Sequence, residues 1–294
     1  MTIRSTAFWT ALAVVIAVAA SAMAQPPAVD IYIAPFSEVE GSISVGQPVN
    51  ATSRPGYDNQ PSFNPAGTAF LYSSQDSSGQ VDVFRYELAT GAITRVTDTP
   101  ESEYSPTILP GGGGFSTVRV EGDGTQRLWR FDLDGSNSRV VLADVDSVGY
   151  HAWADANTVV LFILGQPHSL RMVDTREGDE QIIATDVGRA VSRIPGTREV
   201  CFTRRVGGDQ LWLCRLERPS LRTPRMFRAL EGSEDYAYTP SGVVLMAVGS
   251  SIYRRDDGNA TGWSKVVVLE GMDGITRMVV SPGGTHIAFV ATDS

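Results

Sequence analysis

After an apolar N-terminal stretch, the sequence alternates short runs of β-branched and aromatic residues with turn residues. A turn of Pro-Gly or similar type recurs at intervals of 40 to 45 residues, beginning in turn at Pro65, Pro110, Asp155, Pro195, Pro240 and Pro282. Each turn is followed by a β-rich segment, such as residues 68–73 and 158–164, that is too short for a helix. A regular period of this length indicates a repeat architecture.

Each repeat contains enough β-type segments for one small sheet. Residues 81–84 and 93–96 provide further strands in the first unit, and the segment before the next turn provides a fourth. Four short antiparallel strands joined by Gly, Asp and Asn turns make one blade of a propeller. We therefore predict an all-β fold, a six-bladed β-propeller of four-stranded antiparallel blades.

The last repeat is short, because only residues 285–294 follow its turn. Val29-Asp30-Ile31-Tyr32 matches Val81-Asp82-Val83-Phe84 almost residue for residue. This match predicts that the N-terminal strands complete the last blade and close the ring. Closure of this kind hides the sheet edges that an open array would expose.

Several phrases of the repeat resemble the WD40-like propeller repeat of the TolB family. The clearest are residues 63–70 (FNPAGTAF), 131–135 (FDLDG) and 280–289 (VSPGGTHIAF). The resemblance covers nearly the whole chain after residue 24, and it implies a periplasmic six-bladed propeller that docks other envelope proteins. The sequence departs from TolB because it leaves no room for an N-terminal α/β domain, and it also lacks the α/β-hydrolase domain of propeller-bearing oligopeptidases.

The first residues predict export. Arg4 precedes an apolar run over residues 8–20, and Ala22 and Ala24 are the small residues of a cleavage site. We expect residues 1–24 to be a signal peptide, cleaved near Ala24, and residues 25–294 to form a single propeller domain. The protein would then be periplasmic or secreted, with no membrane span after cleavage, although an uncleaved membrane anchor is the alternative.

The charge and composition narrow the class of partner. The formal net charge is −9 and Lys265 is the only lysine among many arginines and alanines, which suggests a GC-rich bacterial source. A chain of this overall charge is not expected to bind nucleic acid. We expect a monomer whose partner is another envelope protein or a peptide.

The starts of the innermost strands supply the candidate binding residues. We expect one end of the central channel to gather Asp58, Glu103, Tyr104, Tyr150, His151, Arg189, Asp235, Tyr236 and Arg277. Mixed charges and tyrosines at such a mouth would suit a peptide, a sugar, or a metal held by carboxylates. The alternative is a hydrated channel without a ligand.

No catalytic motif is present, because the sequence has neither a Gly-x-Ser-x-Gly elbow nor a glycine-rich phosphate loop. The three histidines lie in separate repeats, so no metal site, no cofactor and no catalytic residue is assigned. We expect a non-catalytic binding or scaffolding propeller of the bacterial cell envelope. The alternative is a metal-dependent hydrolase or lyase acting on a sugar or lactone, with Asp58, Glu103 or Asp235 holding the metal.

The fourth repeat is basic in an acidic chain. Residues 187–228 contain ten arginines and three acids, a net charge of +7. The side chains that we single out as a basic patch are Arg204, Arg205, Arg222 and Arg225. These arginines would steer an anionic partner, unless they pair with acids of the neighbouring blades.

The only two cysteines flank a predicted hairpin. A two-residue turn at Gly207-Gly208 would pair Val206 with Asp209 and place Cys201 directly opposite Cys214. The pair would be non-hydrogen-bonded, which brings side chains close together. In the oxidising periplasm we expect a cross-strand disulfide, with two buried free thiols as the alternative.

Overall fold

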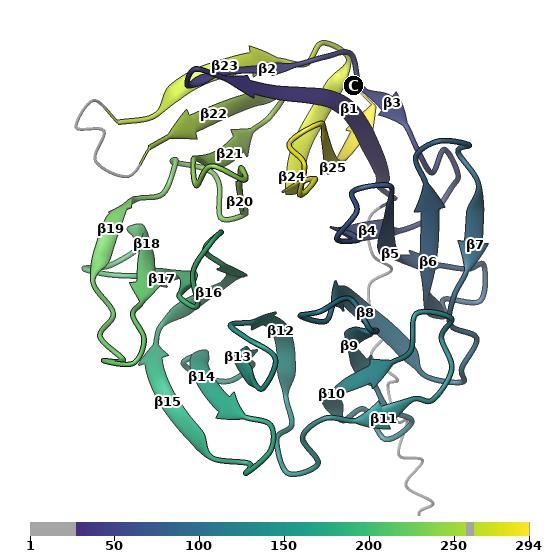
Figure 1. Cartoon of the computed structure of the whole chain (residues 1–294), viewed down its shortest axis with the longest axis vertical. Coiled ribbons are helices and arrows are strands. Elements are labelled where there is room, and N and C mark those ends of the chain that lie inside the picture. Colours follow the sequence, from purple (N-terminus) through teal and green to yellow (C-terminus); the bar gives the residue numbers. More distant parts are fainter. Residues whose placement is uncertain (1–27, 257–261, 294) are drawn as a thin grey trace, which may run out of the picture.

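Six antiparallel sheets form a closed ring in the computed structural model, which describes residues 28–256 and 262–293 (Figure 1). The predicted signal peptide lies outside the described residues. In the described part of the chain every regular element is a strand, and no helix there is long and apolar enough to cross a membrane. The predicted all-β, six-bladed propeller is confirmed.

Five blades are built from consecutive segments, with the first strand of each nearest the ring centre in Figure 1. The first blade consists of β4 (Asp58–Phe63), β5 (Ala69–Gln75), β6 (Val81–Glu87) and β7 (Ile93–Arg95). The second consists of β8 (Ser102–Ile108), β9 (Phe115–Val120), β10 (Gln126–Phe131) and β11 (Arg139–Val140). The third consists of β12 (Val148–Trp153), β13 (Thr158–Ile163), β14 (Ser169–Asp174) and β15 (Glu180–Thr185).

The same order continues through the fourth and fifth blades. The fourth consists of β16 (Val187–Arg193), β17 (Val200–Arg205), β18 (Leu211–Leu216) and β19 (Arg225–Arg228). The fifth consists of β20 (Tyr236–Tyr238), β21 (Val244–Val248), β22 (Ser251–Arg255) and β23 (Ser264–Val268). Each blade runs antiparallel in chain order, as a hairpin-connected sheet requires.

The sixth blade combines the two ends of the described chain. Its inner strands are β24 (Met272–Val280) and β25 (His286–Asp293), and its outer strands are β1 (Asp30–Val39) and β2 (Ser42–Val45). The first half of β1 pairs with β25 over Asp30–Pro35, and the second half pairs with β2. The short β3 (Val49–Asn50) pairs with β1 as well. The predicted ring closure is therefore confirmed.

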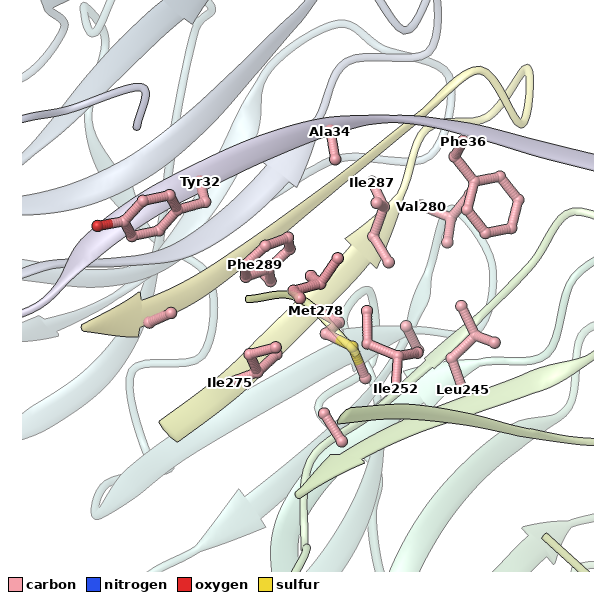
Figure 2. Packing of buried hydrophobic residues seen from close by; sticks show 14 residues of the cluster. Tyr32, Ala34, Phe36, Leu245, Ile252, Ile275, Met278, Val280, Ile287 and Phe289 are labelled. Atoms are coloured by element: carbon pink, nitrogen blue, oxygen red, sulfur yellow. The ribbon is translucent and has the colours of Figure 1, made fainter. Parts of the chain in front are cut away.

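Apolar side chains fix this closure. Tyr32, Ala34 and Phe36 of β1 point into one buried cluster with Ile287 and Phe289 of β25 (Figure 2). The same cluster includes Met278 and Val280 of β24 and Leu245 and Ile252 of the fifth blade. Because the cluster also contains residues of the fifth blade, β1 contributes to the core between the fifth and sixth blades as well as to the sheet of its own blade.

The predicted disulfide is wrong. Cys201 and Cys214 are both buried free thiols, and the register pairs Cys201 with Arg215 and Phe202 with Cys214. The hairpin loop has three residues rather than two, since the Val206 N–H donates to the carbonyl of Gln210 (2.9 Å) and residues 207–209 lie between them.

A register shift of one residue moves every following side chain to the other face of a strand. Cys201 therefore packs with Tyr236 and Val244 of the fifth blade, whereas Cys214 packs on the side of the third blade. Burial raises the pKa of both thiols to about 11, so the two side chains act as small core residues.

Candidate functional site

The inner strands of the blades enclose a central cavity of about 440 Å³. Residues from β4, β8, β12, β16 and β24, together with the start of β20, line it. Five of these inner strands are interrupted by a bulge or irregularity, between Asn59 and Ser62 in β4 and between Tyr104 and Thr107 in β8, for example. A bulge re-aims the side chains beside it, and here it turns them towards the channel.

One end of the channel carries a connected group of charged side chains. Arg189 donates two hydrogen bonds to the carboxylate of Asp235, from Nε (3.2 Å) and Nη2 (2.8 Å). Arg277 lies on the other side of Asp235, with its Nη1 3.6 Å from Oδ1, and its Nη2 donates to the hydroxyl of Tyr150 (2.7 Å). Four of the predicted mouth residues therefore form one group.

The two arginines set the ionisation of the acid between them. Burial alone would raise the pKa of Asp235, but Arg277 and Arg189 hold it below its ordinary value. The hydrogen bonds from Arg189 to Asp235 in turn raise the pKa of Arg189. The Glu234 carboxylate also lies against Arg189 and accepts from its backbone N–H (2.6 Å), so two carboxylates face the two guanidinium groups.

Tyrosines border this charged group. The ring of Tyr150 lies 4.6 Å from the guanidinium carbon of Arg277, a cation–π contact. Tyr57 packs edge-on against Tyr104, with 6.5 Å between ring centroids. Burial raises the pKa of Tyr57, and Tyr150 and Arg277 also influence it, which places Tyr57 beside the mouth group.

Two further predicted residues, His151 and Tyr236, lie in the channel wall. The Nε2 atom of His151 lies 2.7 Å from the hydroxyl of Ser116, and the hydroxyl of Tyr236 donates to the carbonyl of Cys201 (2.6 Å). Both side chains line the cavity and are buried. Burial lowers the pKa of His151 to about 3, so its ring is neutral at physiological pH.

Asp58 and Glu103 do not line the cavity, contrary to our expectation. Both are 0% exposed and are paired with arginines, Asp58 with Arg54 of the segment before β4 and Glu103 with Arg119 of its own blade. Arg54 lies 2.6 Å from Asp58, and Arg119 lies 3.1 Å from Glu103. Each acid stands seven residues before its turn proline, whereas Tyr150, Asp235 and Arg277 stand five residues before the matching turn position.

The distance of a residue from the turn therefore identifies cavity-lining residues that the sequence analysis missed. Five residues before Pro65 and Pro110 stand Gln60 and Ser105, and both line the cavity. Counting back from the turn finds them once the structure shows that the fifth position before it faces the cavity. The count was obscured because the more conspicuous carboxylates lie two residues earlier in the same strands.

The three carboxylates named as possible metal ligands do not come together. Within residues 28–256 and 262–293, no group of three or more His, Cys, Asp or Glu side chains is placed to hold a metal ion. Asp58, Glu103 and Asp235 each contact an arginine instead. An arginine-paired carboxylate is a poor cation ligand, so these residues do not fit a metal.

The arginines of the fourth blade differ in how they are paired. Arg222 is bonded to Glu217 (2.7 Å), and Arg218 reaches Asp155 of the third blade (2.7 Å). Arg204, Arg205 and Arg225 instead line a groove of about 470 Å³ on the fourth blade. The described part of the chain shows no carboxylate in ion-pair contact with these three side chains.

Comparison of the sequence with protein-family models and with curated proteins finds no match. Solved structures share the fold. A protein assigned as TolB from Agrobacterium tumefaciens has a TM-score of 0.71 and 16% identity, covering 90% of this chain and 99% of that chain. TolB from Acinetobacter baumannii has a TM-score of 0.61 and 12% identity. That match covers 90% of this chain and 64% of that chain.

An oligogalacturonate lyase in complex with manganese has a TM-score of 0.53 and 13% identity, covering 92% of this chain and 99% of that chain. At such low identities the likeness defines the fold alone. The class of protein is a six-bladed β-propeller, and among these structures its arrangement is most similar to the TolB propellers. The predicted TolB-like fold is confirmed.

Proposed function

We propose that this protein is a non-catalytic binding propeller of the bacterial cell envelope, periplasmic or secreted after removal of a signal peptide. Its partner is another envelope protein or a peptide with an acidic surface. The TolB-like fold supports a role in binding. The observation that carries the proposal is the groove on the fourth blade, where Arg204, Arg205 and Arg225 have no acidic partner among the described residues.

The groove contrasts with the rest of the molecule. The chain has a formal charge of −9, and other arginines of the fourth blade are neutralised by Asp155, Glu217 and Asp235. Arg225 and Arg228 lie over the ring of Trp212, at 5.0 and 5.4 Å, so an apolar surface adjoins the free charges. Basic and aromatic side chains together are typical of the centre of a protein interface.

Charge reversal tests this surface. The double variant Arg204→Glu and Arg225→Glu should weaken capture of the partner from an envelope extract and reduce its dependence on salt, because steering by unpaired charges is screened by ions. A matched control is Arg130→Glu with Arg139→Glu, a neighbouring pair on the second blade that changes the net charge by the same amount.

Equal capture by the wild type, the groove variant and the control would contradict the proposed docking surface. Loss of capture by both variants would assign the effect to the net charge of the protein. Melting temperatures of all three proteins show whether each variant is folded.

The second candidate is a metal-dependent hydrolase or lyase acting on a sugar or lactone at the channel mouth. The fold shared with an oligogalacturonate lyase favours it. The pairing of Asp58, Glu103 and Asp235 with arginines does not. Elemental analysis of the purified protein separates the two candidates: bound manganese, calcium or zinc that is lost in the Asp235→Asn variant would support the enzyme.

A further inference from the structure

The central cavity is electropositive although the protein is acidic. Of the residues that line it, the charged ones are Arg189, Arg193, Arg277 and Asp235. With Glu234, which lies against Arg189 outside the lining, three cations face two anions, and this positive surplus favours a negatively charged occupant. The volume of about 440 Å³ falls in the range of small-molecule sites.

Arg277 is the side chain best placed to hold an anion. A guanidinium has five N–H donors in a planar fork. Among the described residues, the Arg277 side chain donates one hydrogen bond, to Tyr150, and its Nη1 is 3.6 Å from Asp235, beyond hydrogen-bond reach. Arg189 already meets Asp235 with two donors, so Arg277 can turn its remaining donors to a carboxylate in the cavity.

Besides the hydroxyl of Ser192, two buried polar atoms of the cavity wall have no hydrogen-bond partner in the described part of the chain. They are the hydroxyl Oγ of Ser105 and the Nδ1 of His151, whose residues are 9% and 6% exposed and line the cavity. Buried polar groups are nearly always hydrogen-bonded, and an unpaired one destabilises the fold. A ligand in the channel that reaches either atom through the cavity wall would supply the partner that it lacks.

The hydrogen bonds of the other ring nitrogen of His151 bear on whether the unpaired Nδ1 donates or accepts. Trp153 donates from Nε1 to the Ser116 hydroxyl (2.9 Å), which lies 2.7 Å from Nε2 of His151. The other acceptor near that hydroxyl, the carbonyl of Thr107, is farther away at 3.4 Å. Either atom of the contact between Ser116 and Nε2 can be the donor, so Nδ1 of the neutral ring can donate or accept.

The backbone of the wall is strained where these side chains begin. Gln60, Ser105 and Arg277 have φ values of +60°, +54° and +49°, in the left-handed region that glycine occupies at least cost. All three stand five residues before their turn positions and line the cavity. Strain that recurs at one ring of positions is typical of a functional site.

We propose that the central channel binds a small carboxylic acid that also carries hydroxyl groups, the chemistry of a sugar acid. Its carboxylate lies on Arg277, and its oxygens exchange hydrogen bonds with His151 and Ser105. This site goes beyond the proposed function, because it is separate from the groove of the fourth blade. Either proposal can therefore fail without the other.

A matched pair of probes tests the charge requirement. Titration calorimetry with D-glucuronate and D-glucose compares ligands that differ by one carboxylate. The wild type should bind glucuronate at least about tenfold more tightly than glucose, and Arg277→Gln should weaken glucuronate by about tenfold to a hundredfold. Equal affinities for the two sugars, or no binding of either, would overturn the proposal.

Ser105→Gly separates binding from folding. Glycine accepts the positive φ and removes the unpaired hydroxyl, so the melting temperature should stay unchanged or rise. Glucuronate binding should nevertheless weaken by about threefold to tenfold, because one hydrogen bond is lost. The control is Ser73→Ala, which removes a buried, unpaired hydroxyl of β5 that does not line the cavity and should leave affinity unchanged.

A simply hydrated channel would show no difference between Ser105→Gly and Ser73→Ala, and that result would overturn the proposal. A third arm uses a short peptide with a free or an amidated C-terminus. Binding of the free peptide alone, without glucuronate, would assign the channel to a protein terminus. That outcome would overturn the small-ligand proposal and leave the docking proposal intact.

Discussion

Phe36 provides the sharpest test of how the ring is closed. Its side chain is 4% exposed and packs from β1 into the cluster with Val280 and Ile287 (Figure 2). Val39 lies three residues further along the same strand and is 65% exposed. Replacing each by alanine compares a buried and an exposed apolar side chain of one strand.

The structure gives the size of the expected effect. Truncation of a buried Phe to Ala typically costs about 3 to 5 kcal/mol, because transfer free energy is lost and a cavity remains. In a domain of this size, each kcal/mol lowers the melting temperature by about 2 to 4 °C, so Phe36→Ala should lower it by at least about 6 °C. Val39→Ala should change the free energy of unfolding by no more than about 0.5 kcal/mol.

Urea unfolding followed by circular dichroism measures both variants against the wild type. A lower midpoint with an unchanged slope for Phe36→Ala would indicate a pure loss of stability. If Phe36→Ala and Val39→Ala unfold at the same urea concentration, β1 does not close the ring through this cluster. The pairing of β1 with β25 would then be peripheral to the core.

Two further predictions concern the thiols and the charged group of the channel mouth. When unreduced protein is unfolded in denaturant and alkylated, its intact mass should show two alkyl groups, at Cys201 and Cys214. The native protein should react slowly, because burial raises the pKa of both thiols to about 11. A mass two protons lower with no alkylation would contradict the register. The pKa of Asp235 in the folded protein lies below its ordinary value of 3.8, so the ionised carboxylate stabilises the fold at pH values above 3.8. This stabilisation is lost as the pH falls towards the folded-state pKa. From about pH 5 to about pH 2, the wild type should therefore lose more unfolding free energy than Asp235→Asn, and parallel curves for the two proteins would refute this assignment.

The propeller and its closure could be predicted because they depend on local pattern. Turn residues at a period of 40 to 45 define the blades, and each blade is a set of hairpins between neighbouring segments. The match of Val29–Tyr32 with Val81–Phe84 placed β1 as the third strand of its blade, as β6 is of its own. Hairpin pairing and period-two burial can be recognised without knowledge of distant contacts.

The predicted disulfide was wrong because the loop between the two strands is one residue longer than predicted. Gly207-Gly208 suits a two-residue turn, but both glycines and Asp209 lie in a three-residue loop, with φ values of +66° and +96° at the glycines. The sequence admits both loops. With the three-residue loop, Cys201 packs against the fifth blade and Cys214 packs on the side of the third blade.

The repeat in the sequence determined which strands surround the channel, because every blade contributes the strand before its turn. Only the tertiary structure decided which side chains face the cavity. Bulges in five inner strands bring Gln60 and Ser105 to the wall, while Asp58 and Glu103 remain buried against arginines. A bulge adds one residue to a strand and reverses the faces beyond it, and the long-range contacts that stabilise it have no period along the chain.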